Sequence, residues 1–147
     1  MTESPVPIER LKKLLDQKGV KPSYQRISVL KYIMEHMDHP SVDTIFKNLV
    51  NQIPTLSKTT VYNTLNLLTE KGVITALSID GVEVKYDYIE IPHAHFKCIM
   101  CHKIYDVKLN SDIFKKRSLK GHKITEAQIN LKGICKDCSQ KISVRNN

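Results

Sequence analysis

The feature that most constrains the fold is the placement of the four cysteines. All of them fall into two C-x-x-C pairs, Cys98 with Cys101 and Cys135 with Cys138. In a reducing compartment this pattern favours a metal site over disulfides. Two such pairs can supply four thiolates in the tetrahedral geometry that zinc prefers, so we expect one structural Zn²⁺ ion bound by all four cysteines. The ion would join two distant segments, and its binding free energy would contribute to folding.

Two alternatives to this zinc site remain open. The cysteines could form two separate redox pairs or simply stay reduced. In a mixed site, His95 or His102 would replace one cysteine among the zinc ligands. The paired spacing favours the four-cysteine site.

A second group of candidate ligands surrounds the first cysteine pair. His93 and His95 are separated by one residue, so on a strand both side chains point to the same face and could bind one ion. Asp87 stands in the preceding predicted strand, and a hairpin after Cys101 would bring Asp106 back beside the histidines. Imidazole and carboxylate ligands suit Fe²⁺ or Mn²⁺ better than thiolates do, so we expect an exchangeable regulatory metal here.

Each of these residues also has an ordinary interpretation. A lone histidine on a strand is usually a surface or core residue, and the acidic residues around Asp87 could form a solvated face. Two histidines and a carboxylate also resemble the facial triad of non-haem iron enzymes. Because no substrate pocket or cosubstrate motif is readable, we do not expect an enzyme.

The N-terminal part of the chain has helical periodicity. Apolar residues at helical spacing predict four helices, at residues 8–18, 23–37, 41–52 and 57–71. Two predicted strands follow, at 73–79 and 82–89, joined by Asp80-Gly81, which indicates a two-residue hairpin. This order is typical of a winged helix-turn-helix, whose last helix enters the major groove of DNA. Asp80 and Glu83 would repel phosphates at the tip of the hairpin, so this wing would contribute little affinity.

The fourth predicted helix has two different faces. Val61, Leu65 and Leu68 form its inward stripe, and the opposite face is polar and almost free of acidic residues. A solvated face is the ordinary interpretation, but hydrogen-bonding groups of this kind suit base edges and phosphates. We expect Tyr62 and Asn63 to lie near the bases of the DNA. We expect Lys58 and Thr59 to lie near its phosphates.

The C-terminal part of the sequence predicts mostly short strands instead of a series of helices. Short strands are predicted within 93–98 and 103–109, a helix at about 110–120 and a long strand at about 123–134. We therefore predict an α+β fold with a winged-helix DNA-binding domain at 1–90 and a small α/β dimerisation and metal-binding domain at 91–147. So small a domain has a marginal core, and a metal or a partner subunit is expected to support it.

Charge and hydropathy narrow the class of protein without settling its function. The net charge is +8, and residues 91–147 account for all of it, with twelve Lys or Arg against four Asp or Glu. The total charge therefore says little about the predicted DNA-binding part, although residues 1–31 form a basic patch that could meet phosphates. No segment is apolar enough for a membrane span and no secretion signal is readable, so we expect a cytoplasmic protein with no membrane partner.

Together these motifs resemble the Fur superfamily of metal-dependent bacterial repressors. The resemblance covers nearly the whole chain and rests on five stretches: KPSYQR (21–26), HPSVDTI (39–45), TTVYNTL (59–65), PHAHFKC-x-x-C (92–101) and GIC-x-x-C (133–138). It implies a homodimer that binds a near-palindromic double-stranded DNA operator. It also implies a regulatory metal bound by His39 from the DNA-binding domain together with Asp87, His93, His95 and Asp106.

The two carboxylates suggest a subtype within that family. Aspartate at both positions is similar to peroxide sensors of the PerR type, whereas iron-uptake regulators tend to carry glutamate. The resemblance then implies that Fe²⁺ and peroxide oxidise His39 or His93, which would release the repressor from DNA. An iron- or zinc-uptake regulator without peroxide sensing is the alternative.

Overall fold

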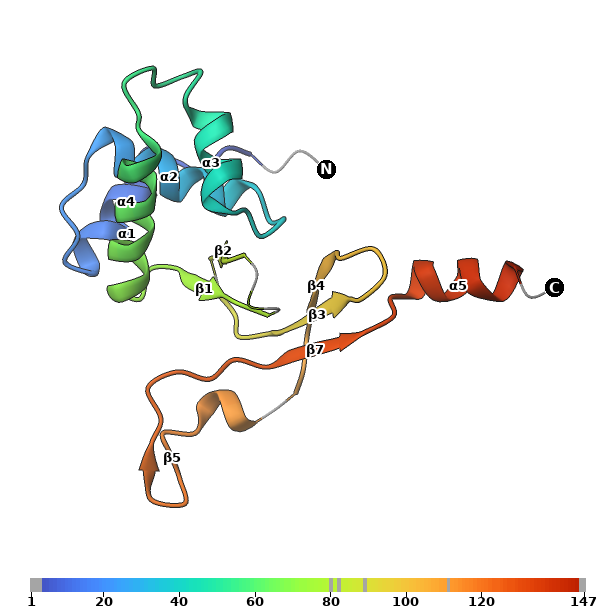
Figure 1. Cartoon of the computed structure of the whole chain (residues 1–147). Helices are drawn as coiled ribbons and strands as arrows, with labels where there is room; N and C mark the ends of the chain where they lie inside the picture. The colour runs from blue at the N-terminus through green and yellow to red at the C-terminus, as the bar shows by residue number, and fades with distance from the viewer. Residues whose placement is uncertain (1–3, 80, 82, 89, 111, 146–147) are drawn as a thin grey trace. The chain divides into compact units, whose positions relative to one another are not determined.

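The computed structural model describes residues 4–79, 81, 83–88, 90–110 and 112–145. The chain divides into two compact units, Met1–Ile89 and Glu90–Asn147 (Figure 1). The first unit is helical with a short two-stranded sheet, and the second is built on a three-stranded sheet. The predicted α+β class is therefore confirmed. In the described part of the chain, no helix has the length and apolar character needed to cross a membrane.

Four helices form the N-terminal unit, close to the predicted ranges. They are α1 (Ile8–Gln17), α2 (Tyr24–Glu35), α3 (Val42–Leu49) and α4 (Lys58–Glu70). Three of them begin after a serine whose hydroxyl accepts a main-chain N–H three residues later, namely Ser23, Ser41 and Ser57. These caps satisfy donors that a helix start leaves without an intrahelical partner, so the starts are set by local sequence.

One apolar core holds these helices together. Each helix contributes fully buried leucine, isoleucine or valine side chains, among them Leu11, Leu30, Ile45, Val61 and Leu65. Ile74 and Tyr86, from the start and end of the following hairpin, are buried in the same core. The polar face of α4 therefore has a fixed orientation, because the opposite face is anchored in the core.

The hairpin after α4 is shorter than predicted. Strand β1 (Thr75–Leu77) pairs antiparallel with β2 (Lys85–Asp87), and the ladder ends at the pair Leu77 and Lys85. The prediction that both strands run up to a turn at Asp80-Gly81 is therefore wrong in the extent of the strands. The turn itself includes Asp80, which lies outside the described residues; Gly81 has φ +71°. A two-stranded ribbon is marginal by itself, and pairing persists where Leu77 and Tyr86 are buried.

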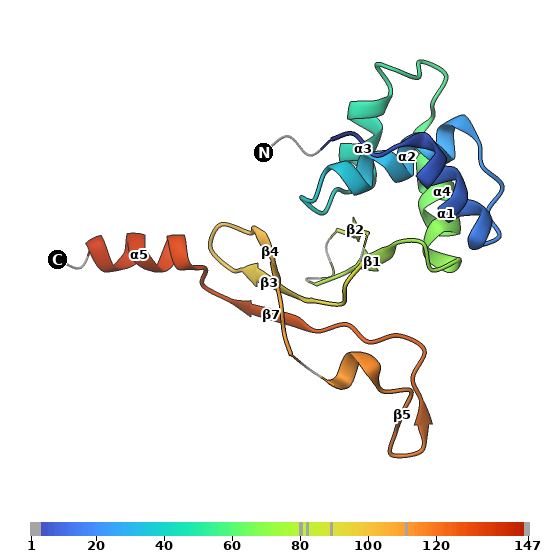
Figure 2. The ribbon, with the colours of Figure 1, turned by 180° about the vertical axis from the view of Figure 1, so that it is seen from behind.

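The C-terminal unit is organised around β3 (Ala94–Cys98), the central strand of its sheet. It pairs antiparallel with β4 (Ile104–Val107) and parallel with β7 (Asn130–Gly133), and the three strands run side by side in both views (Figures 1 and 2). Its apolar cluster consists of Cys98, Cys135 and Cys138 with Phe96 and Tyr105 packed against them. So small a cluster agrees with the expectation that a metal or a partner subunit supports this unit.

Two predicted elements of this unit are wrong. The helix expected at about 110–120 is a single short 3₁₀ turn, η1 (Asp112–Lys115), because its polar sequence has too few apolar residues to anchor a longer helix. The long strand expected at about 123–134 is interrupted. Its first residue, Lys123, ends β6 (His122–Lys123), which forms a small hairpin with β5 (Ser118–Leu119) from the range predicted as helix. Only the end of the predicted strand joins the sheet as β7.

The last helix, α5 (Lys136–Arg145), was not predicted. It begins directly after Cys135, and its first turn contains Cys138. The second C-x-x-C pair therefore lies at a helix start, whereas the first pair spans the end of β3 and the turn that leads to β4.

Candidate metal centres and DNA-reading helix

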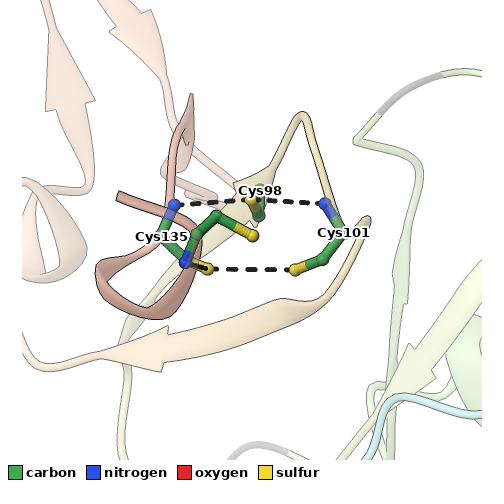
Figure 3. A group of neighbouring side chains, drawn as sticks. Cys98, Cys101 and Cys135 are labelled. Atoms are coloured by element: carbon green, nitrogen blue, oxygen red, sulfur yellow. Dashed lines mark hydrogen bonds between the residues drawn. The ribbon is translucent and has the colours of Figure 1, made fainter. Parts of the chain in front are cut away.

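Cys98 accepts three main-chain hydrogen bonds at the end of β3. Its sulfur lies 3.4 Å from the nitrogen of Met100, 3.5 Å from that of Cys101 and 3.4 Å from that of Cys135. Figure 3 shows the sulfur of Cys98 between the main-chain nitrogens of Cys101 and Cys135. The N–H groups of Cys101 and then Cys135 favour the thiolate and lower the pKa of Cys98 to about 6.

The second cysteine pair supplies the other half of the same cluster. Cys135 Sγ accepts the main-chain N–H of Cys138 at 3.5 Å and lies 3.8 Å from Cys101 Sγ (Figure 3). A hydrogen bond from the Tyr105 hydroxyl is the largest cause of the lowered pKa of Cys135. The Cys138 thiol donates toward Cys135 and is buried, which together raise its pKa to about 12. Without a metal, the four sulfurs share protons through hydrogen bonds. A divalent cation bound by all four would displace these protons.

The spacing of these sulfurs fits a tetrahedral metal. All four lie within 4.8 Å of one another, and none of them is in a disulfide. Zn–S bonds of about 2.3 Å in a tetrahedron place sulfurs about 3.8 Å apart, which matches the separation between Cys101 and Cys135. Among the described residues, the group contains neither His95 nor His102, so the geometry does not favour the mixed site.

His93, His95 and Asp106 converge at the other end of β3. The strand register pairs His95 with Asp106, and His93 immediately precedes the strand. Asp106 Oδ1 lies 3.2 Å from His93 Nε2 and 3.5 Å from His95 Nε2, and these two nitrogens are 3.1 Å apart. The predicted arrangement of a His-x-His strand beside a returning aspartate is therefore present within this unit.

A neighbouring carbonyl orients His93 for binding a cation. His93 Nδ1 lies 3.0 Å from the carbonyl oxygen of Ile91, which can only accept a hydrogen bond. Nδ1 is thus the protonated nitrogen, and Nε2 keeps its lone pair toward His95 and Asp106. Two imidazoles and a carboxylate form a nitrogen and oxygen donor set, which suits Fe²⁺ or Mn²⁺.

His39 and Asp87 lie together within the N-terminal unit. His39 is on the loop between α2 and α3, Asp87 ends β2, and His39 Nε2 is 3.5 Å from Asp87 Oδ2. Both side chains are buried, with exposed fractions of 4% and 2% for the residues. Two of the five residues proposed for the regulatory metal thus lie in the N-terminal unit, and the other three lie in the C-terminal unit.

The outward face of α4 has the predicted composition. Lys58, Thr59, Tyr62 and Asn63 are all exposed, and Val61, Leu65 and Leu68 are buried on the opposite face. Tyr62 is 51% exposed, which leaves its ring and hydroxyl accessible on this face. The Ser57 hydroxyl caps the helix through the N–H of Thr60 at 3.0 Å.

Sequence reasoning missed three features around these sites. Lys58 forms an ion pair with Asp43 of α3, and Tyr105 donates to Cys135; both contacts join residues far apart in the chain. The third feature is a polar hollow of about 380 Å³ beside α4. Its lining includes polar residues from the start of α2 and from α4, among them Lys21, Ser23, Arg26, Thr60 and Asn63. Helical periodicity placed Asn63 on the outward face but gave no signal for the hollow.

Comparison with protein families and curated proteins gives consistent matches. The model of the ferric uptake regulator family matches residues 17–134. The peroxide operon regulator of Bacillus subtilis is 31% identical over 130 residues, which cover 86% of this chain and 90% of that protein.

Solved structures with the same fold include regulators of two kinds. A structure of PerR from Streptococcus pyogenes, described in terms of peroxide sensing and gene regulation, is 30% identical, with a TM-score of 0.51 and coverage of 89% of this chain and 92% of that one. The ferric uptake regulator of Helicobacter pylori has a TM-score of 0.70 at 24% identity, covering 94% and 95% of the two chains. The second likeness concerns the fold alone.

Proposed function

Because the chain belongs to the ferric uptake regulator family, we propose that it is a metal-dependent transcriptional repressor that responds to peroxide. The observation that carries this proposal is the donor set. Aspartate supplies the carboxylate in both groups, Asp87 beside His39 and Asp106 beside His93 and His95. The identity with named peroxide regulators supports it.

We propose that one Fe²⁺ or Mn²⁺ ion takes ligands from both groups. The N-terminal unit would supply His39 and Asp87, and the C-terminal unit would supply His93, His95 and Asp106. An ion bound in this way would stabilise one arrangement of the two units of each subunit. In a homodimer, that arrangement would set the spacing of the two α4 helices to match the half-sites of a near-palindromic operator.

In this proposal peroxide acts on the imidazole ligands. Bound Fe²⁺ would activate peroxide beside them, which Mn²⁺ does poorly. One oxygen atom of peroxide is added to a ring carbon of His39 or His93, where C–H becomes C=O and a ring nitrogen gains the proton; the other oxygen leaves as water. The oxidised ring would be a poor ligand, so the two units would no longer share the ion and the repressor would leave its operator.

The four cysteines would have a structural role in the same proposal. Cys98, Cys101, Cys135 and Cys138 would bind Zn²⁺, which joins the β3–β4 turn to the start of α5. Chelation under mild denaturing stress is then expected to remove about one zinc ion per chain and to unfold or monomerise the protein. If Cys135→Ser retained zinc and the native assembly, the site would not be structural.

One anaerobic preparation tests the central proposal. An operator is selected from a randomised duplex library with Mn²⁺-loaded protein, and its affinity for Fe²⁺- and Mn²⁺-loaded protein is measured before and after dilute peroxide. We expect peroxide to abolish binding by the Fe²⁺ form only, with a mass gain of one oxygen atom on peptides that carry His39 or His93. Fragment spectra assign the added oxygen to individual residues, and the exposed His36 serves as the internal control.

Two results would contradict peroxide sensing. The first is unmodified His39 and His93 with operator binding intact after peroxide, which would favour the alternative of an iron- or zinc-uptake regulator. The second is equal oxidation of His36, which would indicate non-specific damage in solution.

A further inference from the structure

We propose that the Asp43 carboxylate competes with DNA phosphates for the ammonium group of Lys58. By holding that ammonium group, Asp43 weakens binding to DNA of any sequence. The inference rests on the proposed role of α4 in DNA binding. Its effect is to lower affinity without changing which sequence is preferred.

The ion pair joins the two helices of the helix-turn-helix. Lys58 is the first residue of α4, and Asp43 lies in the first turn of α3. Lys58 Nζ contacts Asp43 Oδ1, and the two side chains remain 58% and 53% exposed. An incoming phosphate can therefore reach the ammonium group without any rearrangement of the core.

Asp43 is charged under the conditions in which the protein would bind DNA. The hydrogen bond and the charge of Lys58 lower the pKa of the Asp43 carboxyl, with a smaller contribution from Lys47. A carboxylate in the first turn of a helix is also favoured by the helix dipole. Asp43 therefore places a negative charge beside Lys58, at the start of the proposed DNA-reading helix.

The exposure of this pair makes it exchangeable. Ion pairs between solvent-exposed side chains add little to the stability of a protein, because both groups are well hydrated. Duplex DNA presents a dense row of phosphates, which compete well for an ammonium group. When Lys58 turns to a phosphate, the Asp43 carboxylate loses its partner and stays near the negative backbone, so each binding event carries an electrostatic penalty.

The contact differs from two exposed ion pairs that lie within helices of this unit. Lys12 pairs with Glu9 and Lys31 with Glu35, in each case within one helix at i,i+3 or i,i+4 spacing. Such pairs support a helix locally. The pair of Asp43 with Lys58 instead holds a residue that projects from the outward face of α4.

A double-mutant cycle on the full-length, Mn²⁺-loaded protein tests the proposal. The variants are Asp43→Asn, Lys58→Met and the combination of both. The control is Glu9→Gln, which likewise removes one carboxylate, but from the ion pair of Glu9 with Lys12. Affinities for the selected operator and for a random-sequence duplex are measured by fluorescence anisotropy over a range of salt concentrations, and circular dichroism checks that each variant is folded.

We expect Asp43→Asn to tighten binding to both duplexes by about two- to fivefold, the range of an exposed ion pair. The ratio of operator to random-duplex affinity stays unchanged, and the salt dependence becomes steeper, by at most about 0.9 in the log–log slope. In the Lys58→Met background, Asp43→Asn has little effect, because no ammonium group remains to be released. Glu9→Gln binds like the wild type.

Three outcomes would overturn the proposal and leave the DNA-binding function standing. Weaker binding by Asp43→Asn would mean that Asp43 positions Lys58 for phosphate. An equal gain in the presence and absence of Lys58 would mean that Asp43 repels DNA directly. An equal gain with Glu9→Gln would mean that only net charge matters. If the metal-loaded wild type bound no duplex at all, the proposed function itself would fail.

Discussion

Tyr86 donates its main-chain N–H to the carbonyl oxygen of Pro40 at 3.0 Å, and this bond aligns the strand that carries Asp87 with the loop that carries His39. His39 has φ +55°, a left-handed conformation that is uncommon for a residue with a side chain, and it also precedes a proline, which restricts it further. The surrounding contacts maintain this conformation, and the imidazole lies beside the Asp87 carboxylate. The pair is thus ordered by the N-terminal unit itself.

The charge of Asp87 should matter for the regulatory metal. Asp87→Asn keeps the size of the side chain but removes a negative ligand, so we expect the affinity for Mn²⁺ to fall at least about tenfold, which corresponds to about 1.4 kcal/mol. The Mn²⁺ affinity is measured by calorimetric titration of the zinc-containing protein with Mn²⁺. Asp38→Asn, the same change at an exposed position next to His39, is the control. Unchanged Mn²⁺ affinity in Asp87→Asn would remove Asp87 from the ligand set.

Tyr105 should slow the release of zinc. Its hydroxyl donates to Cys135, and removal of such a hydrogen bond to a metal ligand typically weakens a site by about tenfold or more. We expect Tyr105→Phe to lose zinc to a colorimetric chelator about tenfold faster, while the fold is retained because the ring still packs beside Phe96. Tyr24→Phe, at an exposed tyrosine of α2, should release zinc at the wild-type rate. Equal rates in all three proteins would contradict the role of Tyr105.

The sequence was most informative where structure depends on neighbouring residues. The N-terminal helices could be predicted because their apolar spacing and the serine caps at Ser23, Ser41 and Ser57 are local signals. The cysteine cluster could be predicted because the C-x-x-C spacing already places two thiols on one turn. The pairing of His95 with Asp106 required only that the chain turn back after Cys101.

The features that were missed depend on residues far apart in the chain. Nothing near Lys58 in the sequence indicates that Asp43 is its partner, and the contact of Tyr105 with Cys135 exists only after the sheet has formed. The hairpin of β5 and β6 was overlooked because Lys120-Gly121 is not a common turn pair, yet both residues adopt positive φ, at +48° and +83°. Gly121 makes that turn possible between the ranges predicted as a helix and as a strand.

The packing of α4 should determine how well its outward face is ordered. Leu65 is fully buried in the core, so Leu65→Ala removes packing that the surrounding helices cannot fully recover. We expect the free energy of opening of α4 to fall by about 2–5 kcal/mol. Hydrogen exchange followed by mass spectrometry reports this on peptides from α2 and α4, independently of the metals. Asn66→Ala, the exposed neighbour, should change protection by less than about 0.5 kcal/mol.

Tyr62 should contribute to sequence preference, in contrast to Lys58 on the same face. If the exposed ring and hydroxyl of Tyr62 approach base edges, Tyr62→Ala is expected to weaken operator binding by about 1–3 kcal/mol and random-duplex binding much less. Lys58→Ala, by contrast, should weaken both duplexes alike and flatten the salt dependence by about one unit in the log–log slope. Anisotropy titrations with the selected operator and a random duplex measure both effects. Because α4 is anchored by Val61, Leu65 and Leu68, neither substitution should alter the fold. An equal loss on both duplexes for Tyr62→Ala would mean that Tyr62 binds the DNA backbone and that the sequence is read by other residues.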